Sequence, residues 1–283
     1  MSTILVPTDL GTVSQYALDM AAMVARRRGS SIRMLHAVDT LGGWTESDFS
    51  TPRMASMPPT TQEKFFPEVR KAIGKARAKL DALSAGLGKK KIEATYDIGF
   101  NLAWRSIVDF AGRLPAELIV MGSTGAGGKL FGSNAQHVVR MADCPVLTLR
   151  KAPPDKIANA LILVDTAEKN PGAGLAPLLD ILSSFKCKLH LLHVNTPAGF
   201  DSTYSHTDKL EAFARRLTPA FHLHVIDHFT PVEGAMAFAE RDHMDLIALR
   251  THGRTGIRAA LSASVAEDLM SHGTRPVLVQ RSA

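Results

Sequence analysis

The sequence contains the same four segments twice, in the same order. In the first half they are ILVPTD (Ile4 to Asp9), MLHAV (Met34 to Val38), ELIVMGSTG (Glu117 to Gly125) and CPVLTLR (Cys144 to Arg150). The second half repeats them as ILVDTA (Ile162 to Ala167), LLHVN (Leu191 to Asn195), DLIALRTHG (Asp245 to Gly253) and RPVLVQR (Arg275 to Arg281). Four matched segments in one order indicate a tandem duplication of a domain of about 140 residues. We therefore expect two domains, residues 1–151 and 158–283, joined by a short linker that contains two prolines.

Composition limits the class of protein. Of the 283 residues, 45% are hydrophobic, which suffices for two cores, and no apolar run reaches the length of a transmembrane helix. The first residues, MSTILVPTDL, enter a strand pattern directly and lack the basic region and cleavage pattern of a secretory signal. We therefore expect a cytoplasmic protein that has no membrane partner. Its two cysteines, Cys144 and Cys187, fall in different copies and are expected to be free thiols.

The positive charge of the chain does not by itself predict a nucleic-acid partner. The formal net charge is +6 and the sequence pI is about 9.4. The basic runs Arg26 to Arg28 and Lys89 to Lys91 flank predicted helix ends, where cations are favoured by the helix dipole. Because aromatic residues are not interleaved with these runs, we expect no nucleic-acid binding.

In both copies, short apolar runs rich in β-branched residues alternate with helical patterns. In the first copy the predicted strands are Thr3–Pro7, Ile32–Val38, Ile92–Tyr96, Glu117–Met121 and Val146–Leu149. In the second copy they are Ala160–Val164, Lys188–Val194, Leu223–Ile226, Leu246–Leu249 and Val277–Val279. This alternation predicts the α/β class, with two tandem open, doubly wound domains in which helices flank each parallel sheet.

Candidate binding residues follow the first and fourth strands of the first copy. In open parallel sheets, ligands bind beyond the carboxyl ends of the strands. Asp9 follows the first strand, and a carboxylate can accept hydrogen bonds from ribose hydroxyls or an adenine amine. The glycines from Gly122 to Gly125, and a helix beginning near Gly132-Ser133-Asn134, favour phosphate groups. These features predict a mononucleotide site; the alternative is a tight strand-to-helix turn in which Asp9 is a helix cap.

Together, the segments ILVPTD, LHAV, LIVMGSTG, GSNAQHVV and CPVLTLR resemble the universal stress protein family, and the resemblance covers both halves. It implies a five-stranded sheet of order 3-2-1-4-5 in each domain. In the nucleotide-binding branch of the family, a loop Gly-x2-Gly-x9-Gly-(Ser/Thr) holds the phosphates. Carried over to this sequence, the implied adenine and ribose contacts are Pro7, Thr8, Asp9, Ala37 and Met121. The implied phosphate contacts are Gly122, Gly125, Gly132, Ser133 and Asn134.

Both copies depart from the family pattern. Six residues separate Gly125 from Gly132 where the pattern has nine, so the first site either holds fewer phosphates or has lost nucleotide altogether. In the second copy, Arg250 replaces the first glycine and Ala263 the last, although Ser264 follows as the pattern requires. Aligning ILVPTD with ILVDTA places Ala167 opposite Asp9, which predicts that the second copy lacks the nucleoside carboxylate. We therefore expect a degenerate second site.

Two other groupings could carry chemistry. His222 and His224 share one face of a predicted strand, with His190, His193 and His228 nearby in the sequence, which is one route to a metal site. Exposed polar residues are also ordinary on an edge strand, so no metal is predicted. A second grouping has the residue types of a hydrolase site: Ser133, His137 and Asp143. Because a nucleophile-elbow pattern is absent, no catalytic residue is assigned.

Three functions follow from these patterns. The first is a stress-response or signalling protein that binds AMP, ADP or ATP, with or without Mg²⁺, in the N-terminal domain. The second is a scaffold that binds no nucleotide and acts through an unknown signalling protein or an apolar ligand. The third is at most a slow ATP hydrolase. The linker is short, and the family resemblance implies an exchange of the fifth strands as in related dimers. The domains are therefore expected to form an intramolecular pseudodimer with Val146–Leu149 antiparallel to Val277–Val279; a homodimer of the whole chain is left open.

Overall fold

The computed structural model describes eight segments of the chain. These are residues 2–37, 67–99, 103–123, 133–168, 170–197, 202–218, 220–251 and 263–281. Among the helices within these segments, none is both long and apolar enough to cross a bilayer.

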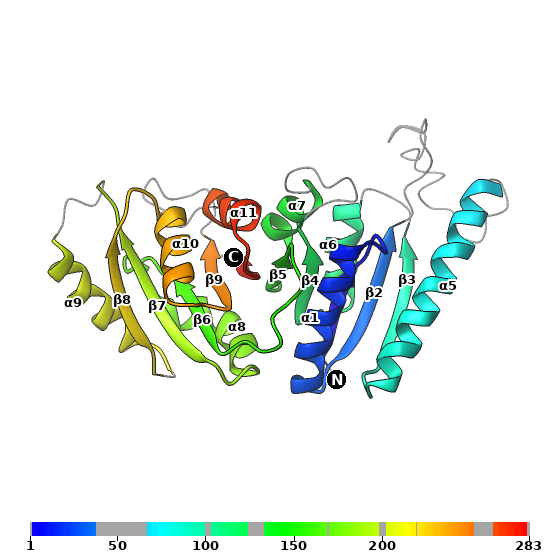
Figure 1. Ribbon diagram of the computed structural model, residues 1–283, viewed down its shortest axis with the longest axis horizontal. Coiled ribbons are helices and arrows are strands. Elements are labelled where there is room, and N and C mark those ends of the chain that lie inside the picture. Colours follow the sequence, from blue (N-terminus) through cyan, green and yellow to red (C-terminus); the bar gives the residue numbers. More distant parts are fainter. Residues whose placement is uncertain are drawn as a thin grey trace.

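Strands and helices alternate through both halves, as the sequence pattern predicts (Figure 1). The N-terminal domain comprises β1 (Thr3–Pro7), α1 (Thr12–Arg28), β2 (Ser31–Ala37), α5 (Pro67–Lys89), β3 (Ala94–Gly99), α6 (Ala103–Arg113), β4 (Leu118–Gly122), α7 (Ser133–Met141) and β5 (Val146–Leu149). The C-terminal domain comprises β6 (Asn159–Leu163), α8 (Pro171–Ser183), β7 (Lys188–Asn195), α9 (Thr203–Ala214), β8 (His222–Asp227), α10 (Pro231–Arg241), β9 (Leu246–Thr251), α11 (Ala263–His272) and β10 (Val277–Arg281).

The ten strands within the described segments form one sheet, in the order β3-β2-β1-β4-β5-β10-β9-β6-β7-β8. Within each domain the neighbours are parallel and the order is 3-2-1-4-5, as the family resemblance implies. At the centre, β5 and β10 run antiparallel, with Val146 opposite Val279 and Thr148 opposite Val277. The predicted intramolecular pairing of these two strands is therefore confirmed.

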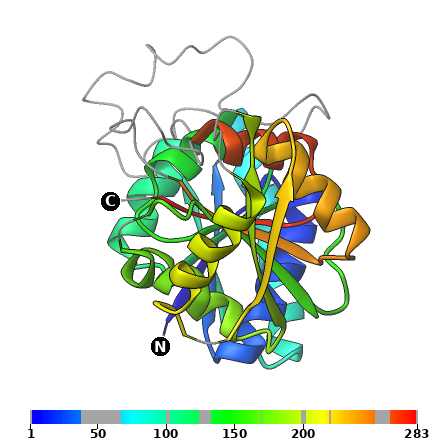
Figure 2. The same ribbon diagram turned by 90° about the vertical axis from the view of Figure 1, so that its left-hand side faces the viewer.

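Two apolar layers enclose the sheet, one on each face. Successive strand residues point to opposite faces, so Ile4 and Val6 pack in one layer and Leu5 in the other. The first layer contains residues of α1, α5, α8 and α9, and the second contains residues of α6, α7, α10 and α11. Each layer runs through both domains, and Figure 2 shows the sheet between its helices from the side of α9 and β8. Burial on both faces explains the nearly continuous apolar strands.

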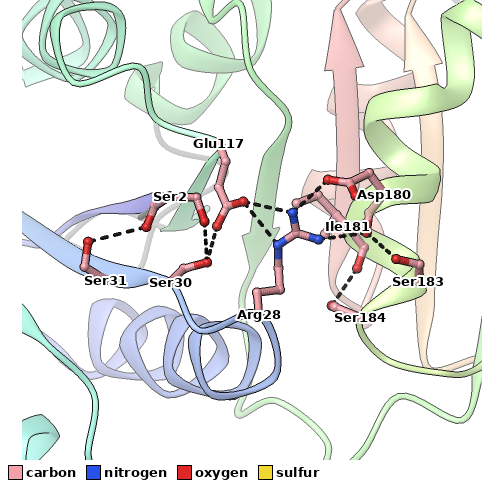
Figure 3. A network of polar contacts seen from close by, with 9 residues as sticks. All are labelled: Ser2, Arg28, Ser30, Ser31, Glu117, Asp180, Ile181, Ser183 and Ser184. Atoms are coloured by element: carbon pink, nitrogen blue, oxygen red, sulfur yellow. Dashed lines mark hydrogen bonds and ion pairs between the residues drawn. The ribbon is translucent and has the colours of Figure 1, made fainter.

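Ion pairs add to the strand pairing between the domains. Arg28, in the last turn of α1, reaches the second domain: its Nη2 lies 2.9 Å from Glu117 Oε2 and 2.7 Å from Asp180 Oδ2 (Figure 3). Its Nη1 also donates to the backbone oxygen of Asp180 at 2.9 Å. Glu117 accepts a further hydrogen bond from the Ser30 hydroxyl. The basic end of α1 is therefore part of the domain interface as well as a match to the helix dipole.

Replacing Arg28 with alanine is expected to lower the free energy of unfolding by about 1–3 kcal/mol, because Glu117 then loses its charged partner. The side chains of Arg28 and Glu117 are only 17% and 15% exposed, so solvent compensates little for the lost pair. Arg26→Ala removes an exposed cation from the same helix turn and is the matched control. Urea unfolding measures both variants, and equal losses would show that Arg28 contributes only its charge at the helix end.

Candidate functional site

The first half of the candidate site is the turn that follows β1. The Thr8 N–H donates to the Leu35 oxygen at 2.9 Å. The Thr8 hydroxyl donates to Ser14 Oγ at 3.0 Å and accepts a hydrogen bond from the Leu10 N–H at 3.0 Å. The Asp9 side chain is exposed, and its Oδ1 accepts the Gly11 N–H at 2.9 Å. The Thr8 hydroxyl is thus committed to the fold, whereas the Asp9 carboxylate lies at the surface beyond the strand end.

The same turn holds a strained residue. Leu10 has a φ of 62°, in the left-handed region that residues other than glycine seldom occupy. The Leu10 and Gly11 N–H groups donate to the Thr8 and Asp9 side-chain oxygens, and these hydrogen bonds fix the conformation and direct the chain into α1. Backbone strain of this kind is common where a fold presents a binding residue.

The second half of the site is the end of β4, beside β1 in the sheet. Gly122 lies against the start of α1: a Cβ at this position would approach Val13 Cγ1 to 2.8 Å. A side chain here would force Val13 to shift, so packing favours a glycine independent of any ligand. Met121, which precedes it, is 5% exposed and belongs to the second apolar layer.

The remaining predicted residues lie at the same edge of the sheet or outside the described segments. Pro7 is buried at the end of β1, and Ala37 is half-buried at the end of β2. Ser133 begins α7 and Asn134 is exposed in its first turn. Because α7 connects two parallel strands, its N-terminus lies at the carboxyl ends of the strands. Gly125 and Gly132 lie outside the described residues.

In the C-terminal domain, the sheet register differs from the register that the sequence match suggests. The Glu117 N–H donates to the Thr3 oxygen at 3.0 Å, and the Asp245 N–H donates to the Asn159 oxygen at 2.9 Å. Asn159 thus takes the position of Thr3 at the start of the strand. Counting along both strands, Asp165 takes the position of Asp9, and Ala167 lies two residues further on.

The hydrogen bonds at the strand ends give the same result. The Val164 N–H donates to the Leu192 oxygen at 3.0 Å, as the Thr8 N–H donates to Leu35. Asp165 Oδ1 accepts the Ala167 N–H at 2.9 Å, which repeats the turn made by Asp9. The prediction that the second copy lacks this carboxylate is therefore wrong. A shift of two residues preserves which side chains face each layer, so apolar alternation alone cannot detect it.

The glycine position of the second site is filled. Arg250 pairs with Gln280 of the adjacent strand, as Gly122 pairs with Leu149, so the predicted match of Gly122 to Arg250 is confirmed. The Arg250 guanidinium forms an ion pair with Glu168, whose side chain is 7% exposed. A Cβ on Gly174 would clash with both side chains, so that glycine makes room for the pair. The Glu168 partner could not be read from the sequence, because it lies 82 residues away.

Two residues of the candidate hydrolytic trio, and one of the two cysteines, lie in well-defined surroundings. His137 stacks on Trp104 with ring centroids 4.8 Å apart, and the Asp143 side chain, 88% exposed, pairs with Arg281. Both of these side chains therefore have partners outside the candidate trio. Burial raises the pKa of the Cys144 thiol to about 11, so this cysteine is protonated at neutral pH and is a poor nucleophile.

Comparison with known protein families finds a match to the same family in each half of the chain. The sequence profile of the universal stress protein family matches residues 1–150 and, separately, residues 159–281. The chain belongs to the universal stress protein family. Its two matched regions show that it is a tandem member, as the internal repeat predicts.

Relatives of this universal stress protein include single-domain and whole-chain matches. A universal stress protein from Methanocaldococcus jannaschii is 31% identical over 153 residues, covering 52% of this chain and 81% of the relative. A universal stress protein structure from Archaeoglobus fulgidus has a TM-score of 0.72 and 18% identity, covering 99% of this chain and 98% of its own. The structure of a functionally unknown protein from Pseudomonas aeruginosa PAO1 has a TM-score of 0.71 and 17% identity; the match covers 99% of this chain and 92% of the other. At these identities the two structures show the shared fold alone.

Proposed function

We propose that the N-terminal domain binds an adenine nucleotide (AMP, ADP or ATP), with or without Mg²⁺, in a stress-response or signalling role, and that the C-terminal domain acts as its pseudodimer partner. The observation that carries this proposal is the difference between the two strand ends. At the first, an exposed carboxylate, Asp9, lies beside a strand that ends in Gly122. At the second, the Arg250–Glu168 ion pair occupies the corresponding position.

Each part of the proposed site has a chemical task. Asp9 accepts hydrogen bonds from ribose hydroxyls, and the apolar residues at the strand ends contact the adenine ring. The N-terminus of α7 and the glycine backbone before it favour the negative phosphates. The residues proposed for this site are Pro7, Thr8, Asp9, Ala37, Met121, Gly122, Gly125, Gly132, Ser133 and Asn134.

A non-nucleotide scaffold is the second candidate, and two contacts favour it. Gly122 is favoured by its packing against Val13, and the Thr8 hydroxyl is used within the turn. Both residues would therefore be retained without any ligand. In this case the chain acts through a protein partner or an apolar ligand, and the Asp9 turn is only a connection from strand to helix.

Release of a bound molecule separates the two candidates. Freshly purified protein is denatured and the supernatant examined by mass spectrometry, with AMP, ADP and ATP as standards. An adenine nucleotide at near-stoichiometric yield supports the proposal. Absence of one, together with no heat of binding on titration with all three nucleotides, would favour the scaffold.

The short loop between Gly125 and Gly132 predicts how the three nucleotides rank. Charge-assisted hydrogen bonds to phosphate contribute about 1.5–3 kcal/mol each, so a loop three residues shorter than the family pattern loses contacts that distinguish ATP from AMP. Calorimetry is expected to give ATP and AMP affinities within about tenfold of each other. ATP binding more than tenfold tighter than AMP would show that the loop reaches the outer phosphates.

A further inference from the structure

Helix α9 packs on β7 and β8 through one stripe of buried side chains, and this stripe begins with a histidine. The buried residues of the helix are His206, Leu210 and Phe213, at intervals of four and three residues. Two of them are apolar, as expected for a helix that covers a sheet. His206, in contrast, is a titratable side chain at an apolar position, and it is 8% exposed. Figure 1 shows α9 beside β8 at the outer end of the molecule, away from the domain interface.

His206 stacks on His193 of β7, with ring centroids 4.7 Å apart and ring planes at 24° to each other. His193 is also buried, and its Nδ1 lies 3.4 Å from the Val164 oxygen. Both nitrogens of His206 are buried, and neither has a hydrogen-bond partner in the described part of the chain. A neutral imidazole carries one donor and one acceptor, so the stacking contact attaches α9 to the sheet while two polar atoms stay unpaired.

Comparison of the two domains separates the roles of these histidines. His36 of β2 takes the position of His193 in the sequence repeat, and its Nδ1 lies 2.8 Å from the Thr8 oxygen at the end of β1. A histidine at this position therefore connects neighbouring strand ends in both copies. His206 has no such task, because its nitrogens bond to no described residue. An apolar side chain would fill its place in the stripe without leaving polar atoms unpaired, so packing does not account for a histidine there.

We propose that the His193–His206 pair is an acid-sensitive clasp, which holds α9 on the sheet at neutral pH and releases it when the pair takes up a proton. A buried charge without a partner is strongly disfavoured, and two adjacent rings disfavour a second charge further. Moving α9 away from β7 hydrates both rings. It also exposes the apolar side chains of the stripe, Leu210 and Phe213, so the clasp presents an apolar surface in acid alone.

The charged groups around His193 determine the direction of the pH response. Burial lowers the pKa of His193, and the neighbouring imidazole and Lys209 of α9 lower it further. The hydrogen bond to the Val164 oxygen and the carboxylate of Asp165, at the end of β6, act in the opposite direction. From β8, the Asp227 carboxylate lies at the same end of α9, where it accepts a hydrogen bond from the first residue of the helix.

Burial has the largest of these effects, so the pKa of His193 is lower with α9 in place than when the ring is hydrated. The clasp is therefore closed above the ordinary pKa of histidine and weakens as the pH falls below it.

Hydrogen exchange of the α9 amides tests the clasp, with rates corrected for the intrinsic effect of pH. In the wild type, the opening of α9 is expected to increase by about fivefold or more between pH 7.5 and pH 5.5. Helix α1 of the N-terminal domain serves as the internal reference and should change by less than about twofold over the same range. An opening of α9 that changes no more than that of α1 would overturn the proposal.

A double variant, His193→Gln with His206→Leu, is expected to lose the response of α9. The glutamine retains a donor for the strand-end oxygen, and the leucine extends the apolar stripe. The matched control is His190→Gln with His224→Gln, since these rings hydrogen bond to each other at 3.0 Å and burial lowers the pKa of both. His224 packs on Phe238 of α10, on the other face of the sheet, so this control should keep the wild-type response. Circular dichroism checks that both proteins are folded, and a full response in the His193, His206 variant would overturn the clasp.

A second measurement needs no variant. In the wild type, the imidazole signals of His193 are expected to titrate below the ordinary pH of histidine, over the same range in which the α9 amides lose protection. A His193 that titrates as an ordinary histidine, with α9 signals unchanged, would overturn the proposal. The clasp lies on different strands from Asp9 and Gly122, so its failure leaves the nucleotide proposal untouched, and the reverse also holds.

Discussion

Asp9→Ala is expected to weaken binding of AMP, ADP and ATP alike, by about a hundredfold or more. Hydrogen bonds to a charged group contribute about 1.5–3 kcal/mol each, and a carboxylate that accepts two ribose hydroxyls would account for two of them. The loss should be equal for the three nucleotides, because they share the nucleoside. Calorimetric titration of the variant with each nucleotide measures it.

Two further variants distinguish ligand binding from folding. Asp9→Asn retains an oxygen that can accept the Gly11 N–H while it removes the charge, so it should fold normally and bind with intermediate affinity. Asp165→Ala makes the same change in the C-terminal domain, where Arg250 and Glu168 fill the site, and should leave nucleotide affinity unchanged. An equal loss from Asp165→Ala would show that the nucleotide lies in the second domain.

The repeat in the sequence predicted the fold more reliably than it predicted the second site. Apolar alternation and the β–α order specify which faces are buried, and the family resemblance supplies the strand order that the structure has. The antiparallel contact of β5 and β10 followed from the short linker together with the exchange of fifth strands that the family resemblance implies. The match of identical residues in the two copies placed Asp9 opposite Ala167, however, whereas the backbone hydrogen bonds place it opposite Asp165. Two alignments that differ by an even number of residues bury the same faces of the strand, so only the backbone register distinguishes between them.

Long-range pairs were the other part that the sequence could not give. The basic end of α1 predicted a helix dipole match, but the partners of Arg28 lie 89 and 152 residues away. The sequence shows that Arg250 replaces the first glycine of the pattern, but it does not reveal the buried carboxylate that neutralises this arginine. Such pairs depend on how separate helices and strands pack, and a local sequence pattern does not predict that packing.

Arg250→Ala is expected to cost about 3–5 kcal/mol of unfolding free energy, because removing one partner of a buried ion pair leaves the other charge uncompensated. Glu168 is 7% exposed and Arg250 19%, so water reaches the pair poorly. The double variant Arg250→Ala, Glu168→Ala should be more stable than Arg250→Ala alone, since it removes the unpaired charge as well. Urea unfolding at pH 7.5 measures all three proteins.

The matched control for this prediction is an exposed ion pair in the same domain. Arg215 and Glu211 lie one helix turn apart, with side chains 76% and 48% exposed. Arg215→Ala should cost only about 0.3–0.5 kcal/mol, as solvent screens such pairs. If Arg250→Ala costs no more than this, the Glu168 carboxylate must be solvated in solution and the second site must be open. The asymmetry between the domains would then have to come from the phosphate loops instead of the ion pair.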